Sequence, residues 1–430
     1  MGRHRSAFKE ALDLKNKAFA LSRLVTMNRP SLRGLLSFYP ERAWPSADRV
    51  QILHRSAHVF PWLAAEFEAQ RSRVFTHNVD HVQPSIWAHE GSAERLVAIV
   101  HDVVVPGHRV TPVDRSTGAQ VHAEAREAVK WATARPSISA LRRRVLSDDL
   151  TIIIPRMDHF GHLLADVLMP LFFAVRMLGF SQGERLNVVT GRRPAPLIGA
   201  FISALRSAGY AVTHVETRVD QTIHVPRYLH AMCHTRNREN KFATPEAIDF
   251  AHEHLSVALG RPADVAPPRL YLQRGPARTR QVAGEERLIA KLESIGFVPF
   301  VARWDNLPEQ LAYFRAAETV VAVHGGALAN CLWMRPDATV IELMAHDARK
   351  SFGLHLASHG GADYHPIFGS KEGPLQNFSV DPDRAFAEIQ GIMAVRSLRV
   401  RDETRPSAVR IGGRRAHDRA TIGRGLARSE

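Results

Sequence analysis

The chain of 430 residues is 45% hydrophobic and 23% charged, which is typical of a globular protein with two domains and excludes a disordered one. The net charge of +14 lies mostly at the ends, because residues 1–33 and 395–430 carry +6 each and leave about +2 for residues 34–394. The body therefore lacks the charge of a nucleic-acid-binding face, and no nucleic-acid partner is expected.

The two basic ends have no features of targeting signals. The first 30 residues contain no uninterrupted apolar core, so no secretory peptide is expected. Residues 1–33 are expected to form a basic helix or arm, which either packs on its own domain or makes peripheral contact with an anionic membrane. The longest apolar stretch, 163–178, is broken by Asp166, Pro170 and Arg176, so no membrane span is expected. We expect a cytoplasmic protein with a disordered tail at 395–430.

In the first half of the body, the sequence pattern is typical of strands at first, and further along the chain it is typical of alternating strands and helices. Between residues 72 and 120 the apolar runs are short and separated by turn residues. From residue 150 onward, apolar strands alternate with longer helical patterns. Strands are predicted at 74–79, 85–88, 96–105, 109–113, 150–154, 186–190 and 222–225, and helices from about 160 to 178 and at 196–208 and 245–259.

The alternation stops at a boundary, 261–268, and then starts again. Strands are predicted at 269–273, 298–302, 320–323, 339–343 and 364–367, and helices at 284–294, 307–317, 327–334, 351–358 and 383–394. Two separate alternations predict an α/β fold with two doubly wound domains, 34–260 and 268–394, and a cleft between them.

A glycine-rich turn lies at the centre of the second alternation. The buried strand 320–323 ends at His324, Gly325 and Gly326, where small residues let the backbone turn tightly and approach a ligand. In open α/β sheets, phosphates bind at such strand ends because helix N–H groups converge there. Glu342, in the following strand, is placed for a ribose diol. The alternative is that Gly-Gly only forms a turn.

In the first alternation, His162 and Asp166 lie one helical turn apart and share a face. Either residue can be a general base, or the aspartate can orient the histidine. The alternative is an ordinary core or surface histidine.

Three sequence blocks together resemble glycosyltransferase family 61: DHFGHLLADVLMPL, RLYLQRG and VVAVHGGALANCLWMRPDATVIEL. The resemblance covers roughly residues 75–380. It implies the GT-B architecture of two Rossmann-like domains, as in bacterial capsular and exopolysaccharide enzymes. It also implies transfer of a sugar from a nucleotide-sugar donor to a glycan or lipid-linked glycan acceptor. We expect an inverting reaction that needs no metal or other cofactor.

The family motifs map onto individual residues here. The family block His-Gly-Ala-Gly-Leu-x-Asn matches 324–330 with Gly and Ala exchanged, and its His-x-x-x-Asp matches His162 and Asp166. An Asn common three residues before that His is His159 here. A helix-opening Glu matches Glu285 or Glu286. The residues implied to bind the donor are Arg274, Arg280, His324, Gly325, Gly326, Ala327, Leu328, Asn330 and Glu342.

The residue types suit this chemistry. Sugar transfer needs a base for the acceptor proton and positive charge for the departing diphosphate. Arg274 and Arg280 offer fixed forks for phosphate oxygens, and with the glycine turn they can replace a metal.

Two alternatives remain open from the sequence. His159, His162 and Asp166 could hold a divalent metal for hydrolysis, and so could a second cluster at 355–365. That cluster consists of His355, His359, Asp363 and His365; its His355 and His359 have helical zinc spacing but lack the glutamate of HExxH. Cys233 and Cys331 make neither a disulfide framework nor a metal site. The other alternative is a GT-B-like protein that binds nucleotide or glycan without turnover.

Overall fold

The computed structural model describes residues 42–43, 47–59, 92–107, 110–115, 120–121, 142–157, 159–179, 183–218, 220–235, 244–259, 266–275, 279–346, 352–359 and 361–404. The predicted arm at 1–33 and the predicted strands at 74–79 and 85–88 lie outside the described residues. Contacts group the chain into residues 1–386 and 387–430, so both sheets belong to one compact unit. The predicted division into 34–260 and 268–394 stays a prediction.

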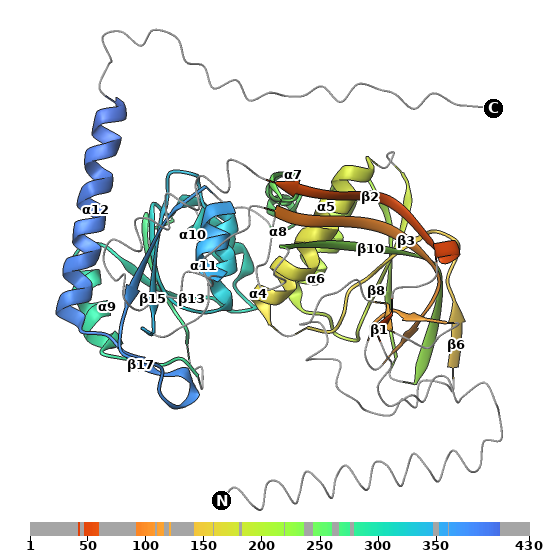
Figure 1. The fold of residues 1–430 in the computed structure, drawn as a ribbon, viewed down its shortest axis with the longest axis horizontal. Coiled ribbons are helices and arrows are strands. Elements are labelled where there is room, and N and C mark those ends of the chain that lie inside the picture. The colour runs from red at the N-terminus through yellow and green to blue at the C-terminus, as the bar shows by residue number, and fades with distance from the viewer. Residues whose placement is uncertain are drawn as a thin grey trace, which may run out of the picture. The chain divides into compact units, whose positions relative to one another are not determined.

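The first sheet has ten strands and is mixed (Figure 1). Its order is β1-β5-β4-β3-β10-β7-β8-β9, with β2 beside β3 and β6 beside β10. The long strands β3 and β10 are antiparallel, whereas β7, β8 and β9 are parallel. The strands are β1 Arg42–Ala43, β2 Val50–Val59, β3 Ser92–Pro106, β4 Val113–Asp114, β5 Gln120–Val121, β6 Arg142–Val145, β7 Leu150–Ile153, β8 Arg185–Thr190, β9 Ala211–Glu216 and β10 Gln221–Thr235.

This sheet corrects the prediction of a purely doubly wound first domain. Only β7 to β9 and their helices follow that pattern, because β3 pairs with β10, more than 100 residues further along the chain. Strand β10 is much longer than the predicted 222–225, and β2 and β9 were not predicted. The strand predicted at 109–113 is wrong, since Val110 has a left-handed φ of 56° and turns the chain before β4.

The helices of the first half bury an aromatic core. The ring of Phe172 lies 4.9 Å from that of Phe201 and 5.4 Å from that of Phe250, measured between centroids. The segment Phe160–Leu178 has the length and composition of a membrane span, and 67% of it is buried inside the fold, as in a core helix. The helices are η3 Ala47–Arg49, α4 Phe160–His162, the π-helix η4 Leu163–Leu168, α5 Met169–Leu178, α6 Pro196–Ser207, α7 Pro245–Phe250, the π-helix η5 Ala251–Leu255 and α8 Ser256–Leu259.

The second sheet is parallel and has the order β13-β11-β14-β15-β16. Its strands agree with the predicted ones to within one residue at each end. Figure 1 shows α9 on one side of this sheet and α10 and α11 on the other. The elements are β11 Arg269–Gln273, β12 Val282–Ala283, α9 Glu285–Glu293, β13 Val298–Val301, α10 Leu307–Ala316, β14 Thr319–Val323, η6 Gly326–Trp333, β15 Thr339–Met344, α11 Phe352–His359, β16 Asp363–Phe368, η7 Pro374–Gln376, β17 Phe378–Ser379 and α12 Pro382–Thr404.

Two predicted helices differ in the second half. The segment predicted as an α-helix at 327–334 is a 3₁₀-helix, η6, in which Met334 N–H bonds to the carbonyl of Cys331, three residues back. It is packed on three other helices, α4, α10 and α11, so tertiary contacts decide its winding. The closing helix α12 continues past residue 394 to Thr404, so the first ten residues of the predicted disordered tail are helical.

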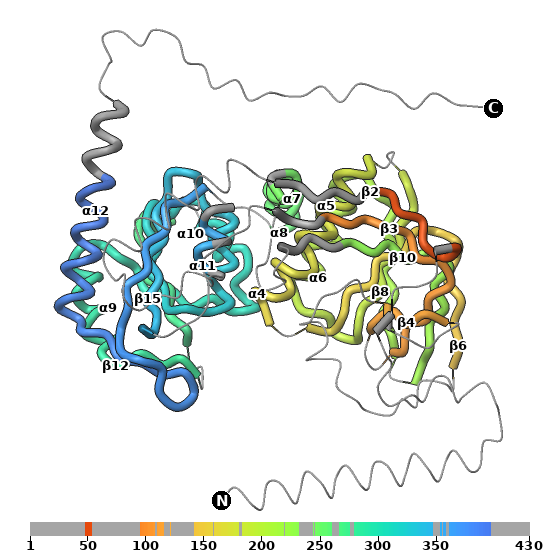
Figure 2. Tube along the Cα trace, viewed as in Figure 1, coloured from red at the N-terminus to blue at the C-terminus, as the bar shows by residue number. Residues whose placement is uncertain are grey.

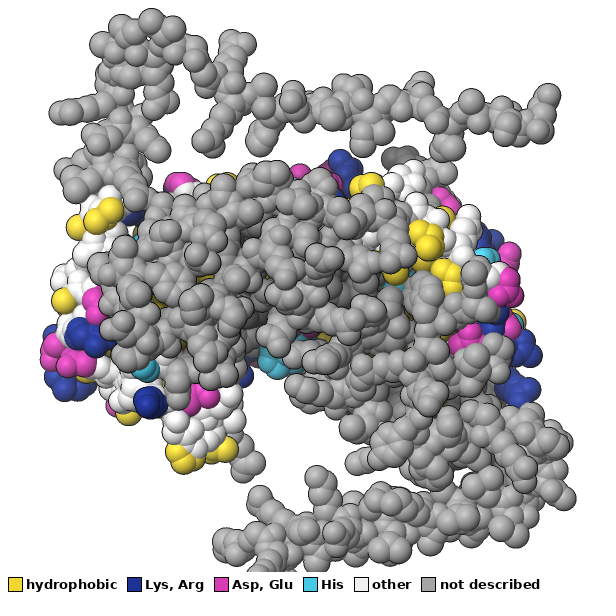
Figure 3. Space-filling view, viewed as in Figure 1, with side chains coloured by type: hydrophobic (Ala, Val, Ile, Leu, Met, Phe, Trp, Pro, Cys, Tyr) yellow, Lys and Arg dark blue, Asp and Glu magenta, His cyan; other side chains and the backbone are white. Residues whose placement is uncertain are grey.

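One hydrophobic cluster is shared by the helices of both sheets. It contains Leu164 and Phe172 from the first half and Leu328 and Trp333 from the second. His252 contributes a polar contact there: its Nε2 lies 3.0 Å from the carbonyl oxygen of Leu332. Figure 2 follows the chain from the first sheet, coloured red to green, into the second, coloured cyan and blue. In Figure 3 the described basic and acidic side chains are interspersed on the visible face.

His252 makes the stability of this shared core depend on pH. Burial lowers its pKa from the ordinary 6.5, so the folded chain keeps the ring neutral where the unfolded chain takes up a proton. The free energy of unfolding should therefore fall as pH drops below 6.5, by at most about 1.4 kcal/mol per pH unit from this residue. His252→Gln keeps a donor for Leu332 but cannot titrate. Urea unfolding between pH 5 and 8 should give a shallower slope for the variant; identical slopes would refute this role.

Candidate functional site

The second sheet reverses its strand order between β11 and β14. These strands are hydrogen-bonded neighbours, with Arg269 opposite Thr319 and Leu272 opposite Ala322. From β11 the chain crosses to β13 on one side, and the later strands follow on the other. In doubly wound sheets, ligands bind at the carboxyl ends of the two strands that flank such a reversal. Arg274 follows β11 and His324 follows β14, so the fold brings these two predicted residues to that position.

Arg274 carries an unsatisfied donor at this strand end. Its Nη1 donates to the backbone carbonyl of His324 at 2.5 Å, while its Nε is buried and has no hydrogen-bond partner among the described residues. Burial and the nearby charge of Arg280 lower the pKa of the Arg274 guanidinium. Glu285 attracts it from a distance, and the carboxylate of Glu285 accepts from the hydroxyl of Tyr271 at 3.0 Å. Two neighbouring arginines with a free buried donor are suited to an anion.

Arg280 is held by a second loop in an unusual backbone conformation. Its Nε donates to Oε1 of Gln376 at 2.9 Å, and its N–H donates to the carbonyl of Leu375 at 2.9 Å. Arg280, Leu375 and Gln376 all have left-handed φ angles, between 60° and 63°. Left-handed conformations are costly for residues other than glycine and cluster at binding sites. Sequence patterns gave no sign of Gln376, because its partner is 96 residues away.

Protein side chains pack so closely against Gly325 and Gly326 that neither position has room for a Cβ atom. A Cβ atom on Gly325 would lie 2.5 Å from Nη1 of Arg274, and one on Gly326 would collide with the ring of His159. The sequence predicted that the backbone of Gly326 would approach a ligand. The structure brings His159, from the first half of the chain, against it, and the approach of a ligand stays a prediction.

Glu342 is not exposed to a ribose, contrary to the prediction. Its side chain is fully buried, and Oε1 is hydrogen-bonded to Nδ1 of His324. Oε2 accepts from the hydroxyl of Tyr364 at 2.5 Å. Burial and the charge of Glu342 raise the pKa of that hydroxyl well above its ordinary value, so Tyr364 remains a donor. The carboxylate therefore orients His324.

Two more predicted donor-binding residues have structural roles. Leu328 is fully buried in the shared hydrophobic cluster, and Asn330 is 1% exposed. The side-chain amide of Asn330 donates to Oε1 of Gln310 at 2.9 Å and to the carbonyl of Ala327 at 3.0 Å. These bonds fix η6 on α10. Ala327 itself is half-buried next to the turn.

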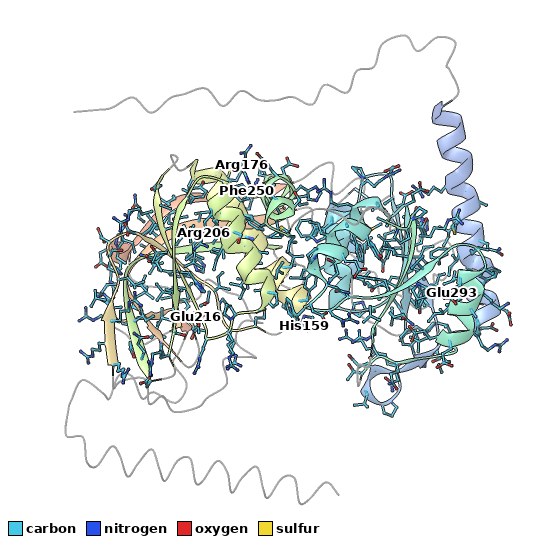
Figure 4. The ribbon with its side chains drawn as sticks, turned by 180° about the vertical axis from the view of Figure 1, so that it is seen from behind. His159, Arg176, Arg206, Glu216, Phe250 and Glu293 are labelled. Carbon is cyan, nitrogen blue, oxygen red and sulfur yellow. The ribbon has the colours of Figure 1, made fainter. Side chains whose placement is uncertain are left out.

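The predicted catalytic pair lies on the helix that contacts the glycine turn. Nδ1 of His162 is 2.8 Å from Oδ2 of Asp166, across the start of the π-helix η4. His159 precedes them; its ring accepts from the His162 N–H at 3.4 Å (Figure 4). π-turns were not predicted, and they are frequent at functional sites. A Cβ on Gly161 would lie 2.7 Å from the carbonyl of Gly326, so α4 and the turn are in direct contact.

The described side chains give little support to a metal centre. Among them, no three His, Cys, Asp or Glu residues converge on one point, including His159, His162 and Asp166. The side chains of His355 and His359 lie outside the described set. Cys331 is buried, and burial raises the pKa of its thiol far above the ordinary range.

Residues 160–341 match the family model of Glycosyltransferase 61. The match begins at the first residue of α4 and ends within β15, so it contains the His162–Asp166 pair, Arg274, Arg280 and the glycine turn. The chain is also 25% identical over 205 residues to Beta-1,2-xylosyltransferase XAX1 of Oryza sativa subsp. japonica. That alignment covers 44% of this chain and 35% of the rice protein, so the chain spans about a third of its length. Both comparisons support the family that the sequence motifs predicted.

The contact between α4 and the glycine turn can be tested with two glycines. Gly161→Ala places a Cβ 2.7 Å from a backbone oxygen, and overpacking of this kind costs about 1–3 kcal/mol. Gly199→Ala is the matched control, because it is also helical and nothing lies within 4 Å of its new Cβ. The control should gain about 0.5–1 kcal/mol of stability from helix propensity. Chemical denaturation measures both, and equal changes in the two variants would contradict the packing described here.

Proposed function

We propose that this chain is a glycosyltransferase that moves a sugar from a nucleotide-sugar donor to a hydroxyl of a glycan or polysaccharide precursor. The observation that carries the proposal is the buried, unsatisfied Nε of Arg274 beside Arg280 at the carboxyl ends of β11 and β14. A diphosphate supplies the negative charge and the acceptor oxygens with which these cationic donors can pair. The match of residues 160–341 to a glycosyltransferase family supports the same function.

In the proposed reaction, the acceptor oxygen forms a bond to the anomeric carbon of the sugar. The bond from that carbon to the diphosphate oxygen breaks, and the nucleoside diphosphate leaves with the electron pair. Arg274 and Arg280 stabilise the negative charge that develops on it, because both are fixed before the reaction begins. One displacement of this kind inverts the anomeric configuration, and the two arginines provide the charge that a metal supplies in other enzymes.

The proposed base is the His162–Asp166 pair. The acceptor proton passes to one member, and the 2.8 Å contact keeps the partner in place to stabilise the charge change. Both side chains are about one-fifth exposed, so an acceptor can reach them. Their helix touches the glycine turn, which sets the base at a fixed position relative to Arg274.

The setting of the reaction is also a proposal. A GT-B arrangement would place the donor on the second sheet and the acceptor on the first. The basic residues 1–33 favour a cytoplasmic enzyme at the anionic inner face of a membrane, where precursors of a bacterial capsule or exopolysaccharide would be extended.

The donor site can be tested by binding. A thermal-shift screen of UDP-, GDP-, CMP- and dTDP-sugars identifies the donor, because a ligand of the folded state raises the melting temperature. Arg274→Ala should then weaken donor binding by about 10- to 100-fold, since it removes charge-assisted hydrogen bonds to phosphate. Arg303→Ala is the control, an exposed arginine paired with Asp305. Calorimetry that finds the same affinity in both variants would contradict the donor site.

The catalytic pair can be tested by turnover. Asp166→Asn should lower kcat by roughly 10²–10⁴ while donor affinity stays near that of the unchanged protein. Treatment with a chelator should leave the activity intact. Full activity in both His162→Ala and Asp166→Asn would place the base elsewhere, and loss of activity on chelation would favour metal chemistry. Donor binding without any transfer or hydrolysis would favour a binding protein.

A further inference from the structure

A group of arginines lies at the carboxyl ends of two neighbouring strands in the first sheet. Arg156 follows β7, and Arg192 and Arg193 follow β8; we call these three residues the basic rim. The two strands are parallel neighbours, with Ile153 opposite Val189. A Cβ on Gly191 would lie 3.7 Å from the Cβ of Arg156, so the two connections are in contact.

The guanidinium groups of the basic rim face solvent without a neutralising partner in the described part of the chain. All three residues are exposed, and no described carboxylate lies within ion-pair distance of them. The nearest strand end, that of β9, carries Glu216 (Figure 4) and then Arg218, whose guanidinium is paired with Asp220 at 3.3 Å. Among the residues that the structure describes, the three arginines therefore outnumber the unpaired acidic groups at this edge of the sheet.

The loop that carries two of these arginines contains one left-handed residue and two prolines, which restrict its backbone. Arg193 has a left-handed φ of 54°, and prolines follow at positions 194 and 196. Pro196 begins α6, and its N-cap residue Ala195 provides no side-chain hydrogen bond to the helix start. A fixed loop loses little freedom on binding, and the positive end of the helix adds to the field of the arginines. Left-handed residues other than glycine are frequent at binding sites.

We propose that the basic rim binds an oxyanion of the acceptor, either a carboxylate of an acidic sugar or a phosphate of a lipid-linked glycan. The inference rests on the proposed function, and it specifies the acceptor as an anionic one. Arg156 precedes His159 by three residues and His162 by six, so this member of the rim lies on the short segment that leads into the helix of the proposed base. An acceptor held by its anionic group at the rim can present a neighbouring hydroxyl to the base.

The test uses binding of matched acidic and neutral probes to the full chain by calorimetry at low and high salt. The probes are a galacturonic acid tetramer against a galactose tetramer, and farnesyl phosphate against farnesol. The acidic member of at least one pair should bind more tightly, and high salt should weaken it. Preference for the carboxylate or for the phosphate identifies the source of the oxyanion.

Two double variants locate the binding. Arg192→Ala with Arg193→Asn removes two charges, and asparagine tolerates the left-handed backbone at 193; acidic-probe binding should fall by about 10- to 100-fold. Arg192→Lys with Arg193→Lys should recover part of it. Arg176→Ala with Arg206→Ala is the control, since these exposed arginines lie in the last turns of α5 and α6 (Figure 4). It should change the affinity by less than about twofold.

Two outcomes would overturn the inference. These are equal binding of acidic and neutral probes, or unchanged acidic-probe binding in the rim variant. Failure of the proposed function looks different, because no nucleotide-sugar would then bind, whatever the acidic probes do. If nucleotide-sugar binding is normal and sensitive to Arg274→Ala while the rim variant behaves like the control, only the anionic acceptor is refuted.

Discussion

The contact between α4 and the Gly325–Gly326 turn is the constraint on which the rest of the candidate site depends. His159 and Gly161 lie against Gly326, and the Arg274 guanidinium lies against Gly325. Any side chain larger than hydrogen at either glycine would push one of these groups away. The turn therefore serves as a spacer between the helix that carries the histidine–aspartate pair and the arginine that follows β11.

A network of buried polar side chains holds His324, the residue that begins the turn. Tyr364 bonds to Glu342, Glu342 to His324, and the carbonyl of His324 accepts from Arg274. Each group is buried or half-buried, so the loss of one member would leave its neighbour unsatisfied at a cost of about 1–3 kcal/mol. The sequence predicted that Glu342 binds a ligand. Its carboxylate instead contributes to the site indirectly, because it orients His324, whose carbonyl holds Arg274.

The sequence predicted those parts of the fold that local patterns determine. Strands such as β14 and β15 are mostly apolar because both faces are buried, with Glu342 the one charged residue in β15, and this pattern can be recognised without knowing the partner strands. The pairing of β3 with β10, the contact of His159 with Gly326 and the bond from Arg280 to Gln376 join residues far apart in sequence. Asn330 and Glu342 could not be separated from ligand-binding residues either, because an inward-facing polar side chain looks the same in sequence whichever partner it finds.

The placement of Arg274 and Arg280 lowers the folding stability of the chain. Arg274 is partly desolvated beside another positive charge and keeps a buried donor unpaired, while Arg280 is held in a left-handed backbone conformation by a strained loop. Folding energy elsewhere, above all the hydrophobic cluster shared by both sheets, must offset these costs. An anion bound between the arginines would relieve the repulsion and satisfy the donor together. The same features that lower the stability of the chain would therefore contribute to affinity for a negatively charged ligand and, more strongly, for a transition state in which that charge increases.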